Sequence, residues 1–243
     1  MQNDYGYIDI HSHIIPEVDD GSGSIEETKA MLQTAYEEGI RTIIATPHFD
    51  LETERETEFL IKQYHLAQEE AAKIDHNFQI YLGNEIYYEK GCQTFLKEGK
   101  AFAMAKSRYV LVEFSPSESY PTIYDGMKEF ILDGFIPIIA HIERYMCLIK
   151  HVDRIEELIE LGCYMQVNAS SLTGGLFNKQ SACLRGLVTA GLVHFIATDC
   201  HHQDFRKPLM KACVKKLSKC VEEEKIKELL YENPKKILEN RYI

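Results

Sequence analysis

Two histidines separated by one residue, His11 and His13, are the first side chains in the chain that could carry out chemistry. If the apolar run 7–10 forms a strand, alternate side chains along its continuation point to the same side. Two imidazoles could then bind one metal ion without distorting the backbone. An isolated H-x-H pair is a weak signal for a metal site, so the remaining polar residues decide its interpretation.

Further histidines and carboxylates follow short apolar runs along the chain. Runs of Ile, Val, Ala and Phe are typical of strands that are buried on both faces, as in parallel sheets. A carboxylate at the end of such a strand needs a partner, because burying it alone is costly. The candidates at the ends of the seven predicted strands are His11 and His13, His48, Glu85, Glu113, His141, Asn168, and finally Asp199 and His201. A turn at Asp19-Asp20-Gly21 could bring one more carboxylate back over the first strand end.

A recurring pattern predicts the elements that position these residues. An amphipathic segment ends at a glycine (Gly39, Gly134, Gly162 or Gly191), and a short apolar run follows. Glycine suits a helix C-terminus, where a left-handed backbone conformation is needed. Three further strand candidates are 7–10, 78–82 and 109–112, which brings the total to seven. The predicted helices span 24–38, with a capping box at Ser24 and Glu27, 52–75, 122–133, 152–161, 179–190, 206–220 and 222–231.

Repeated βα units of this kind predict either a parallel barrel or a doubly wound sheet. In a barrel, the carboxyl ends of all strands meet on one face. In an open sheet, they spread along an edge and meet only where the strand order reverses. Because every predicted strand ends in a candidate residue, we favour an α/β fold with a seven-stranded (β/α) barrel, formed by a single domain over residues 1–243.

The candidate set is larger than one metal ion requires. Imidazole and carboxylate ligands without thiolate suit Mn²⁺, Fe or Zn²⁺ rather than a closed structural zinc site. Two or three ions that share carboxylates would account for the surplus. Arg144 and Arg206 follow candidate ligands closely and could bind a phosphate through their planar guanidinium groups. Alternatively, both arginines could serve as partners of the acids.

Cys200 and Arg206 also match C-x5-R, the pattern of thiol-based phosphatases. That chemistry needs a loop of backbone N–H groups around the phosphate and a stabilised thiolate. The residues between them, HHQDF, contain no glycine, and Asp199 next to the cysteine would raise its pKa. We therefore expect a metal mechanism rather than a thiol mechanism. The roles of Cys200 and His202 stay open at this point.

Composition limits the partners and the compartment. The formal net charge of -11 disfavours nucleic acid and anionic membranes, whereas bound divalent cations would offset it locally. Seven cysteines without a C-x-x-C pair indicate reduced thiols in the cytoplasm. No secretory segment opens the chain, and no apolar run is long enough to cross a bilayer. We therefore expect a cytoplasmic protein without membrane insertion, and we predict no particular oligomeric state.

The candidate residues lie in motifs that resemble a known family. The segments IDIHSHIIPEVDDGS, ATPHF, GNEIYY, VEFS, AHIERY, GCYMQVNASS and IATDCHH resemble the PHP (polymerase and histidinol phosphatase) superfamily. They look most like its capsule-associated bacterial protein-tyrosine phosphatases, over nearly the whole chain. The resemblance implies a distorted, TIM-like (β/α)7 barrel, the PHP fold. It also implies three divalent metal ions, first of all Mn²⁺, with Fe and Zn²⁺ as alternatives.

The resemblance also assigns ligands and phosphate contacts. One ion would bind His11, His13, Glu85 and Asp199. A second would share Glu85 and add Glu113 and His141. A third would bind Asp20, His48 and His201. The arginines that the family places near the substrate phosphate correspond to Arg144 and Arg206.

The activity implied is hydrolysis of phosphotyrosine on a protein by metal-activated water, with the arginines neutralising phosphoryl charge. The resemblance alone suggests the partner, a bacterial tyrosine kinase whose tyrosine-rich tail controls export of capsular polysaccharide or exopolysaccharide. One alternative is a phosphatase of a small phosphate monoester, such as histidinol phosphate. Another is a non-catalytic metal-binding regulatory module. The loops 49–58, 115–121 and 169–178 should be open for a protein substrate and closed for a metabolite.

Overall fold

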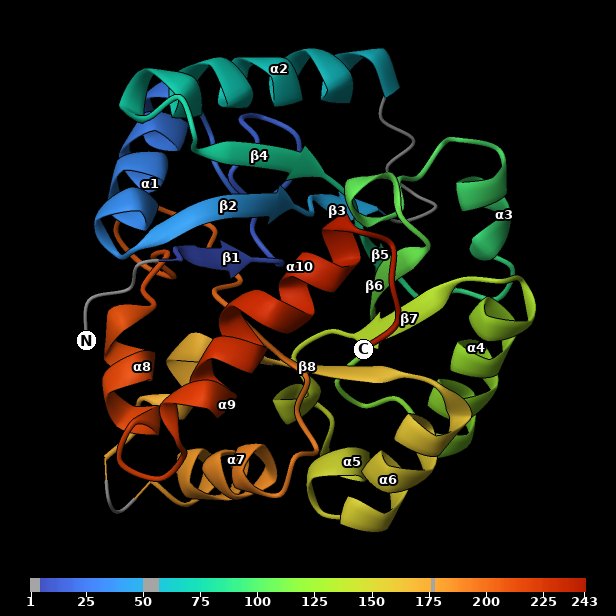
Figure 1. Cartoon of the computed structure of the whole chain (residues 1–243). Helices are drawn as coiled ribbons and strands as arrows, with labels where there is room; N and C mark the ends of the chain where they lie inside the picture. Colours follow the sequence, from blue (N-terminus) through green and yellow to red (C-terminus); the bar gives the residue numbers. More distant parts are fainter. Residues whose placement is uncertain (1–4, 50–56, 176–177) are drawn as a thin grey trace.

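A computed structural model of the chain describes residues 5–49, 57–175 and 178–243. Figure 1 shows the strands at the centre of the molecule, most helices around them, and α10 (Asn233–Leu238) across them. The strands are β1 (Tyr7–Asp9), β2 (Ile40–Ala45), β3 (His48–Phe49), β4 (Gln79–Leu82), β5 (Glu85–Tyr87), β6 (Tyr109–Glu113), β7 (Ile136–Ile139), β8 (Tyr164–Asn168) and β9 (Phe195–Ala197). The other α-helices are α1 (Ile25–Glu37), α2 (Thr57–Ile74), α3 (Gln93–Lys97), α4 (Tyr120–Leu132), α5 (Met146–Ile149), α6 (Val152–Leu161), α7 (Lys179–Thr189), α8 (Lys211–Leu217) and α9 (Glu223–Lys227).

The strands form two parallel sheets, ordered β1-β2-β4 and β3-β5-β6-β7-β8-β9. The chain runs directly from β2 into β3 and from β4 into β5, so these nine segments occupy seven positions. The first break lies at Thr46-Pro47, where proline has no N–H to donate to a ladder. The Pro47 carbonyl still accepts a hydrogen bond from the Glu85 amide at 3.2 Å. Consequently His48 and Glu85 begin short second segments instead of ending the strands predicted before them.

The barrel closes between β1 and β9 near their carboxyl ends. Ser12 and Cys200 form an isolated parallel bridge. The His13 amide donates to the Cys200 carbonyl, and the Asp199 amide donates to the His11 carbonyl, both at 2.9 Å. The predicted parallel α/β fold with a distorted, TIM-like barrel is therefore confirmed, with a seam of few hydrogen bonds.

The two ends of the barrel differ in chemistry. Ile8, Leu111, Ile138 and Phe195 point into an apolar cluster inside the barrel, which also contains Ile237 of α10. The segment after α10 reaches the starts of several strands; for example, the Tyr109 hydroxyl donates to the Arg241 carbonyl at 2.7 Å. Apolar residues and the C-terminal segment thus fill the amino-terminal end of the barrel, and polar side chains occupy the carboxyl-terminal end.

The predicted signals at helix termini are largely present. The Ser24 hydroxyl accepts the Glu27 amide at 3.2 Å, and the Glu27 carboxylate accepts the Gly23 amide at 3.0 Å. All four glycines of the recurring pattern have positive φ angles, as expected: Gly39 92°, Gly134 86°, Gly162 111° and Gly191 78°. No helix in the described ranges is both long and apolar enough to cross a bilayer.

Several predicted helix boundaries were wrong. The helix expected at 206–220 begins only at Lys211, because Pro208 follows Arg206, which has a φ of 52°. The helix expected at 222–231 is α9 followed by a π-helical segment, η4 (Glu228–Glu232), which leads into α10. Helix α4 begins two residues early, because Ser119 caps it and Pro121 fits its first turn. Residues 52–56 of the helix predicted at 52–75 lie outside the described residues.

The left-handed helix terminus at Gly162 gives a testable prediction. We expect Gly162→Ala to destabilise the fold by about 1–2 kcal/mol, because φ is 111° and an L side chain is strained there. The matched control is Gly186→Ala in the exposed interior of α7, where nothing lies within 4 Å of the added Cβ. The control should stabilise by about 0.5–1 kcal/mol. Urea unfolding measures both changes, and a shift of both variants in the same direction would contradict the expectation.

Candidate metal centre

Glu85 is the centre of the polar cluster at the carboxyl-terminal end of the barrel. Its Oε2 atom lies 3.1 Å from His11 Nε2, 3.3 Å from His13 Nε2 and 3.2 Å from His48 Nδ1. Its Oε1 atom lies 2.8 Å from His141 Nε2. The side chain is 1% exposed. One buried carboxylate therefore contacts four imidazoles that come from three separate parts of the barrel.

The first predicted ligand group is closely packed. Asp199 Oδ1 lies 3.4 Å from His11 Nε2 and 3.6 Å from His13 Nε2, and the two imidazole nitrogens are 3.2 Å apart. Together with Glu85, these residues each offer one donor atom to a common centre. Tetrahedral donors at about 2.1 Å from a metal ion are about 3.4 Å from one another. The spacing and the chemistry of this donor set therefore fit a divalent cation.

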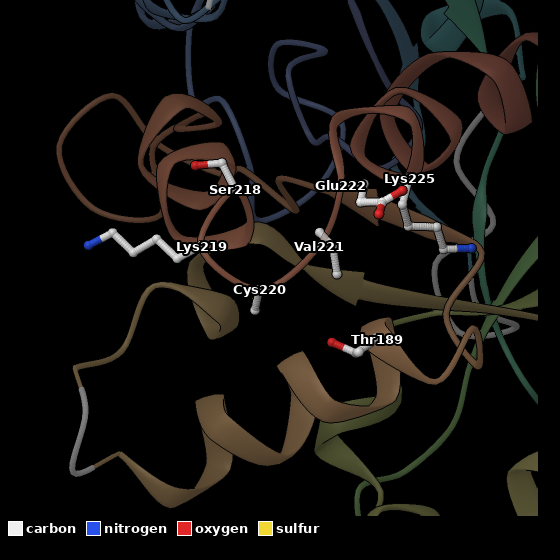
Figure 2. Close-up of a pocket in the computed structure, with 7 residues that line it drawn as sticks. All are labelled: Thr189, Ser218, Lys219, Cys220, Val221, Glu222 and Lys225. Carbon is white, nitrogen blue, oxygen red and sulfur yellow. The ribbon is translucent and has the colours of Figure 1, made fainter.

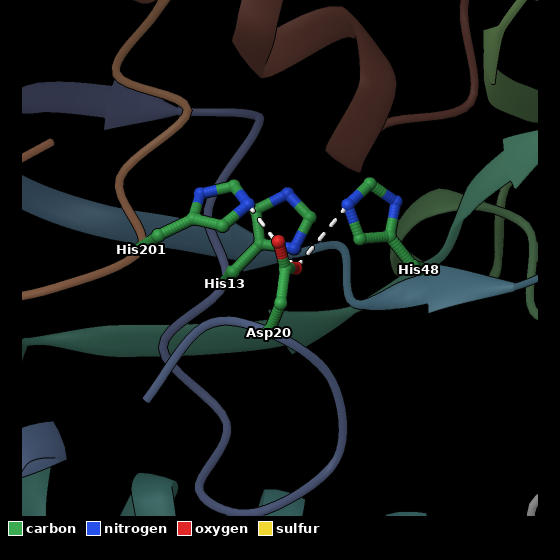
Figure 3. Close-up of side chains that lie close together, drawn as sticks. All are labelled: His13, Asp20, His48 and His201. Atoms are coloured by element: carbon green, nitrogen blue, oxygen red, sulfur yellow. Dashed lines mark ion pairs between the residues drawn. The ribbon is translucent and has the colours of Figure 1, made fainter. Parts of the chain in front are cut away.

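A second group forms around Asp20, whose carboxylate lies between His48 and His201 in Figure 3. Asp20 Oδ1 lies 3.5 Å from His48 Nε2 and 3.4 Å from His201 Nε2. Among the described residues, the buried His201 Nε2 atom has no hydrogen-bond partner. The donor atoms of His13 also lie within this group, although the resemblance assigned His13 to a different ion. An orphaned nitrogen that faces a carboxylate is the arrangement that a bound cation would complete.

Glu113 connects the remaining predicted ligands. Its Oε1 atom lies 3.1 Å from His48 Nδ1, and its Oε2 atom lies 3.4 Å from His141 Nε2. With Glu85, it forms a third group of donors that could hold an ion. All nine residues predicted as metal ligands are thus brought together at this end of the barrel.

The charged groups in the cluster shift one another's pKa values. Burial raises the pKa of Glu85, but the surrounding histidines outweigh that effect and hold it well below its usual range. The pKa of Asp199 is lowered to about 2, since His11, His13 and Arg206 outweigh the effect of burial. Burial opposes protonation of His13, yet the carboxylates of Asp19 and Glu85 raise its pKa to about 10. Protonated imidazole here supplies the positive charge that a divalent cation could supply instead.

Both predicted phosphate-binding arginines reach the cluster through Asp199. Arg144 Nη2 donates to Asp199 Oδ2, and Arg206 Nη2 donates to Oδ1, each at 2.7 Å. The Asn168 amide donates to Oδ2 at the same distance. In this arrangement the arginines are partners of an acid, the alternative noted from the sequence. More than a third of each side chain is exposed, so both also present N–H groups to the opening of the site.

Gln166 is a functional residue that the sequence interpretation missed. Its Oε1 atom accepts the backbone N–H of His141 at 2.7 Å and lies 3.3 Å from His11 Nδ1. Its side-chain amide nitrogen donates to the side-chain Oδ1 atom of Asn168 at 2.9 Å. The signal was present, because Gln166 lies two residues before Asn168 in an otherwise apolar strand, on the same face. Gln166 therefore helps to position two of the histidines, the backbone of His141 and the ring of His11.

Two of the predicted ligands have unusual backbone conformations. His141 has a φ of 32° and Asp199 a φ of 51°, although neither is glycine. Residues in this region are strained and persist only where surrounding contacts hold them. Here the Gln166 side chain holds the His141 amide, and the seam hydrogen bond from Asp199 to His11 holds the other. The left-handed backbone conformation directs both side chains toward the cluster.

Asp19, the neighbour of the predicted ligand Asp20, has a different role. Its Oδ2 atom accepts hydrogen bonds from His13 Nδ1 at 2.7 Å and from the His48 amide at 3.1 Å. Its Oδ1 atom accepts the Gly21 amide at 3.0 Å. Only glycine fits at position 21, since a Cβ atom there would lie 2.3 Å from the His13 carbonyl oxygen. Asp19 therefore orients the His13 ring so that Nε2 faces the cluster.

The structure also shows whether the cysteine of the C-x5-R pattern could act as a nucleophile. Cys200 is fully buried, its sulfur lies 3.2 Å from the Ser12 hydroxyl, and burial raises its pKa to about 12. It therefore has no thiolate character. His202 lies outside the cluster, with Nδ1 3.4 Å from Glu27 of α1.

Two hollows of similar size differ in their relation to the cluster. One, of about 480 Å³, includes Asp199 and Arg206 in its lining. The other, of about 490 Å³, lies between the end of α7 and the turn from α8 to α9, where Figure 2 shows Thr189, Cys220 and Lys225. No predicted site residue lines the second hollow. Only the first is placed to serve the cluster.

Known proteins resemble this chain over most of its length. A family model described as capsular polysaccharide synthesis, CpsB/CapC, matches residues 7–239. The chain is 36% identical over 246 residues to the tyrosine-protein phosphatase CpsB of Streptococcus pneumoniae, covering 97% of this chain and 100% of CpsB. It is 34% identical over 205 residues to the tyrosine-protein phosphatase YwqE of Bacillus subtilis, covering 80% of this chain and 77% of YwqE.

A solved structure is also similar over nearly the full length. It comes from work on YwqE from Bacillus subtilis and CpsB from Streptococcus pneumoniae, described as unique metal-dependent tyrosine phosphatases. The superposition has a TM-score of 0.86 at 30% sequence identity and covers 97% of this chain and 96% of the other.

The contacts of Asp19 predict its effect on metal binding. We expect Asp19→Ala to weaken the binding of Mn²⁺ or Zn²⁺ by about 10–100-fold, because His13 loses the acceptor that orients its ring. Asp19→Asn retains an oxygen acceptor and should recover part of the loss. Competition with a chromogenic chelator measures the affinities, with Asp153→Ala on the exposed face of α6 as control. Equal affinities for all three variants would show that Asp19 has no such role.

Proposed function

Because the chain belongs to the CpsB/CapC family of capsular polysaccharide synthesis, we propose that it is a metal-dependent protein-tyrosine phosphatase, a phosphoric monoester hydrolase. Its membership of that family confirms the resemblance found in the motifs. The observation that carries the proposal is the group of His11, His13, Glu85 and Asp199, whose donor atoms surround a common centre.

We propose three divalent metal ions as cofactors, with Mn²⁺ first and Fe or Zn²⁺ as alternatives. The support is the presence of three donor groups that overlap at His13, His48 and Glu85. The proposed ligands are His11, His13, Asp20, His48, Glu85, Glu113, His141, Asp199 and His201. When bound, such ions would lower the pKa of a water molecule to provide the nucleophile and would polarise the phosphoryl oxygens.

The protein's own residues would then position the phosphate. Arg144 and Arg206 approach Asp199 through its two different oxygens, and both are partly exposed. Their remaining N–H groups can donate to phosphoryl oxygens, where charge develops in the transition state. Asn168 continues to hold Asp199 while the arginines contact the substrate. The phenolate of tyrosine leaves readily, since its conjugate acid has a pKa of about 10.

The proposed substrate is phosphotyrosine on a protein. The relatives above are named tyrosine-protein phosphatases, which favours this substrate over a small monoester such as histidinol phosphate. A non-catalytic metal-binding module is less favoured, since the described residues include all nine proposed ligands. From the capsular polysaccharide context of the family, we also propose a bacterial tyrosine kinase tail as partner. We place the enzyme in the cytoplasm, because its cysteines are unpaired. We also propose that residues 1–243 form one domain.

The metal mechanism predicts that chelation abolishes hydrolysis of a phosphotyrosine peptide and that Mn²⁺ restores it. His141→Ala should lower kcat/KM by at least roughly a hundredfold, because it removes a proposed ligand. Cys200→Ser should keep kcat/KM within about threefold, since a buried thiol with a raised pKa is no nucleophile. Steady-state release of phosphate measures these effects. Loss of activity in Cys200→Ser, with His141→Ala unaffected, would reverse the assignment.

A substrate panel separates the protein phosphatase from a metabolite phosphatase. We expect kcat/KM for a phosphotyrosine peptide to exceed that for histidinol phosphate by about tenfold or more, because phenolate is the better leaving group. Both substrates are assayed with the Mn²⁺-loaded protein. A preference for histidinol phosphate would instead support the small-monoester alternative.

A further inference from the structure

The pocket beside Arg206 extends the site away from the metal cluster. Its volume of about 480 Å³ falls within the range of about 300–1,000 Å³ that is usual for ligand pockets. It shares three residues with the site, Asn168, Asp199 and Arg206. A molecule whose phosphate lies at the arginines therefore has this pocket directly next to it. The lining also includes Ser170 of η3 (Ala169–Leu172), Thr173 just after it, Leu209 before α8, and Ala212 at the start of α8.

The wall that carries Arg206 is held in place from both ends. The His201 amide donates to the Arg206 carbonyl at 3.0 Å and closes a short loop. Glu27 of α1 accepts the Gln203 amide at 3.3 Å. At the other end, Glu38 accepts the amides of Met210 and Lys211 at 2.9 and 2.8 Å. The pocket therefore has a preformed wall rather than one that must be ordered on binding.

The lining suits a polypeptide better than an aromatic ring or a small metabolite. Within the described residues, neither Asp204 nor Lys207 has an ion-pair partner, although both line the pocket. They can accept from a peptide N–H and donate to a peptide carbonyl. Leu209 is 44% exposed, and the neighbouring Phe205, which packs against the His202 ring at 4.1 Å between centroids, is 63% exposed. Leu209 lines the pocket and offers apolar contact to a side chain of a bound segment, whereas Phe205 lies outside the lining.

We propose that the pocket beside Arg206 binds the segment of the substrate protein that adjoins the phosphotyrosine. The proposal rests on the proposed phosphatase function and deepens it. The pocket would hold a short extended segment, with Lys207 and Asp204 contacting its backbone and Leu209 contacting a side chain. This subsite would make the enzyme prefer a phosphotyrosine within a polypeptide over the free phosphoamino acid.

The test compares two substrates with the Mn²⁺-loaded full-length protein: a phosphotyrosine decapeptide and free phosphotyrosine. Ala212→Phe fills the pocket from an exposed position at the start of α8. We expect it to lower kcat/KM for the peptide by about tenfold or more and to change that for free phosphotyrosine by less than about twofold. Lys207→Ala should show the same split with a smaller loss on the peptide. The matched control is Ala190→Phe, at the exposed end of α7, which should leave both substrates unchanged.

The outcomes are distinct. An equal loss on both substrates in Ala212→Phe and Lys207→Ala would mean that the pocket holds the tyrosine ring itself, which overturns the proposal. No change on either substrate would overturn it as well. If the unaltered protein hydrolyses neither substrate, the phosphatase function itself fails. Free phosphotyrosine hydrolysis by each variant also reports whether it has folded.

Discussion

The structure of the site depends on the burial of one carboxylate. Glu85 is 1% exposed in the barrel, and an isolated ionised group there would cost several kcal/mol. Four imidazoles surround it, and their charge stabilises its ionised form. Each imidazole then needs a partner on its other ring nitrogen, which Asp19 supplies for His13 and Gln166 for His11. The outer contacts of the site follow from this requirement.

The barrel meets that requirement because its apolar and its polar residues lie at opposite ends. An apolar cluster fills the amino-terminal end, with residues such as Leu111 and Phe195 and with Ile237 from α10. The carboxyl-terminal end can therefore be polar without weakening the core. The breaks at Thr46-Pro47 and before Glu85 let two strands change direction as they enter the polar layer. The fold and the candidate site are thus parts of one arrangement, in which the core excludes water from one side of the cluster.

Much of the fold and of the candidate site was predictable from local patterns in the sequence. The apolar runs ending in His, Glu or Asp predicted both the barrel and the residues that meet at its rim, since parallel strands place equivalent ends together. The pattern could not predict contacts between distant segments. Gln166 reaches His11 across 155 positions in the chain, and no spacing rule encodes that approach. The left-handed conformations of His141 and Asp199 were equally hidden, because local preference disfavours them and only tertiary contacts hold them. The predicted helix start at Arg206 failed because that residue serves the loop beside the site.

The seam between β1 and β9 has a consequence for how the chain folds. The Asp9 carboxylate accepts the Thr198 amide at 2.9 Å, and these residues are 189 positions apart. During synthesis, one edge of β1 must stay unpaired until Thr198 has left the ribosome. Contacts this distant in sequence are associated with slow folding and with exposed strand edges on the way. His11 and Asp199, which flank this seam, can approach each other only in its last step, so the catalytic rim is completed when the barrel closes.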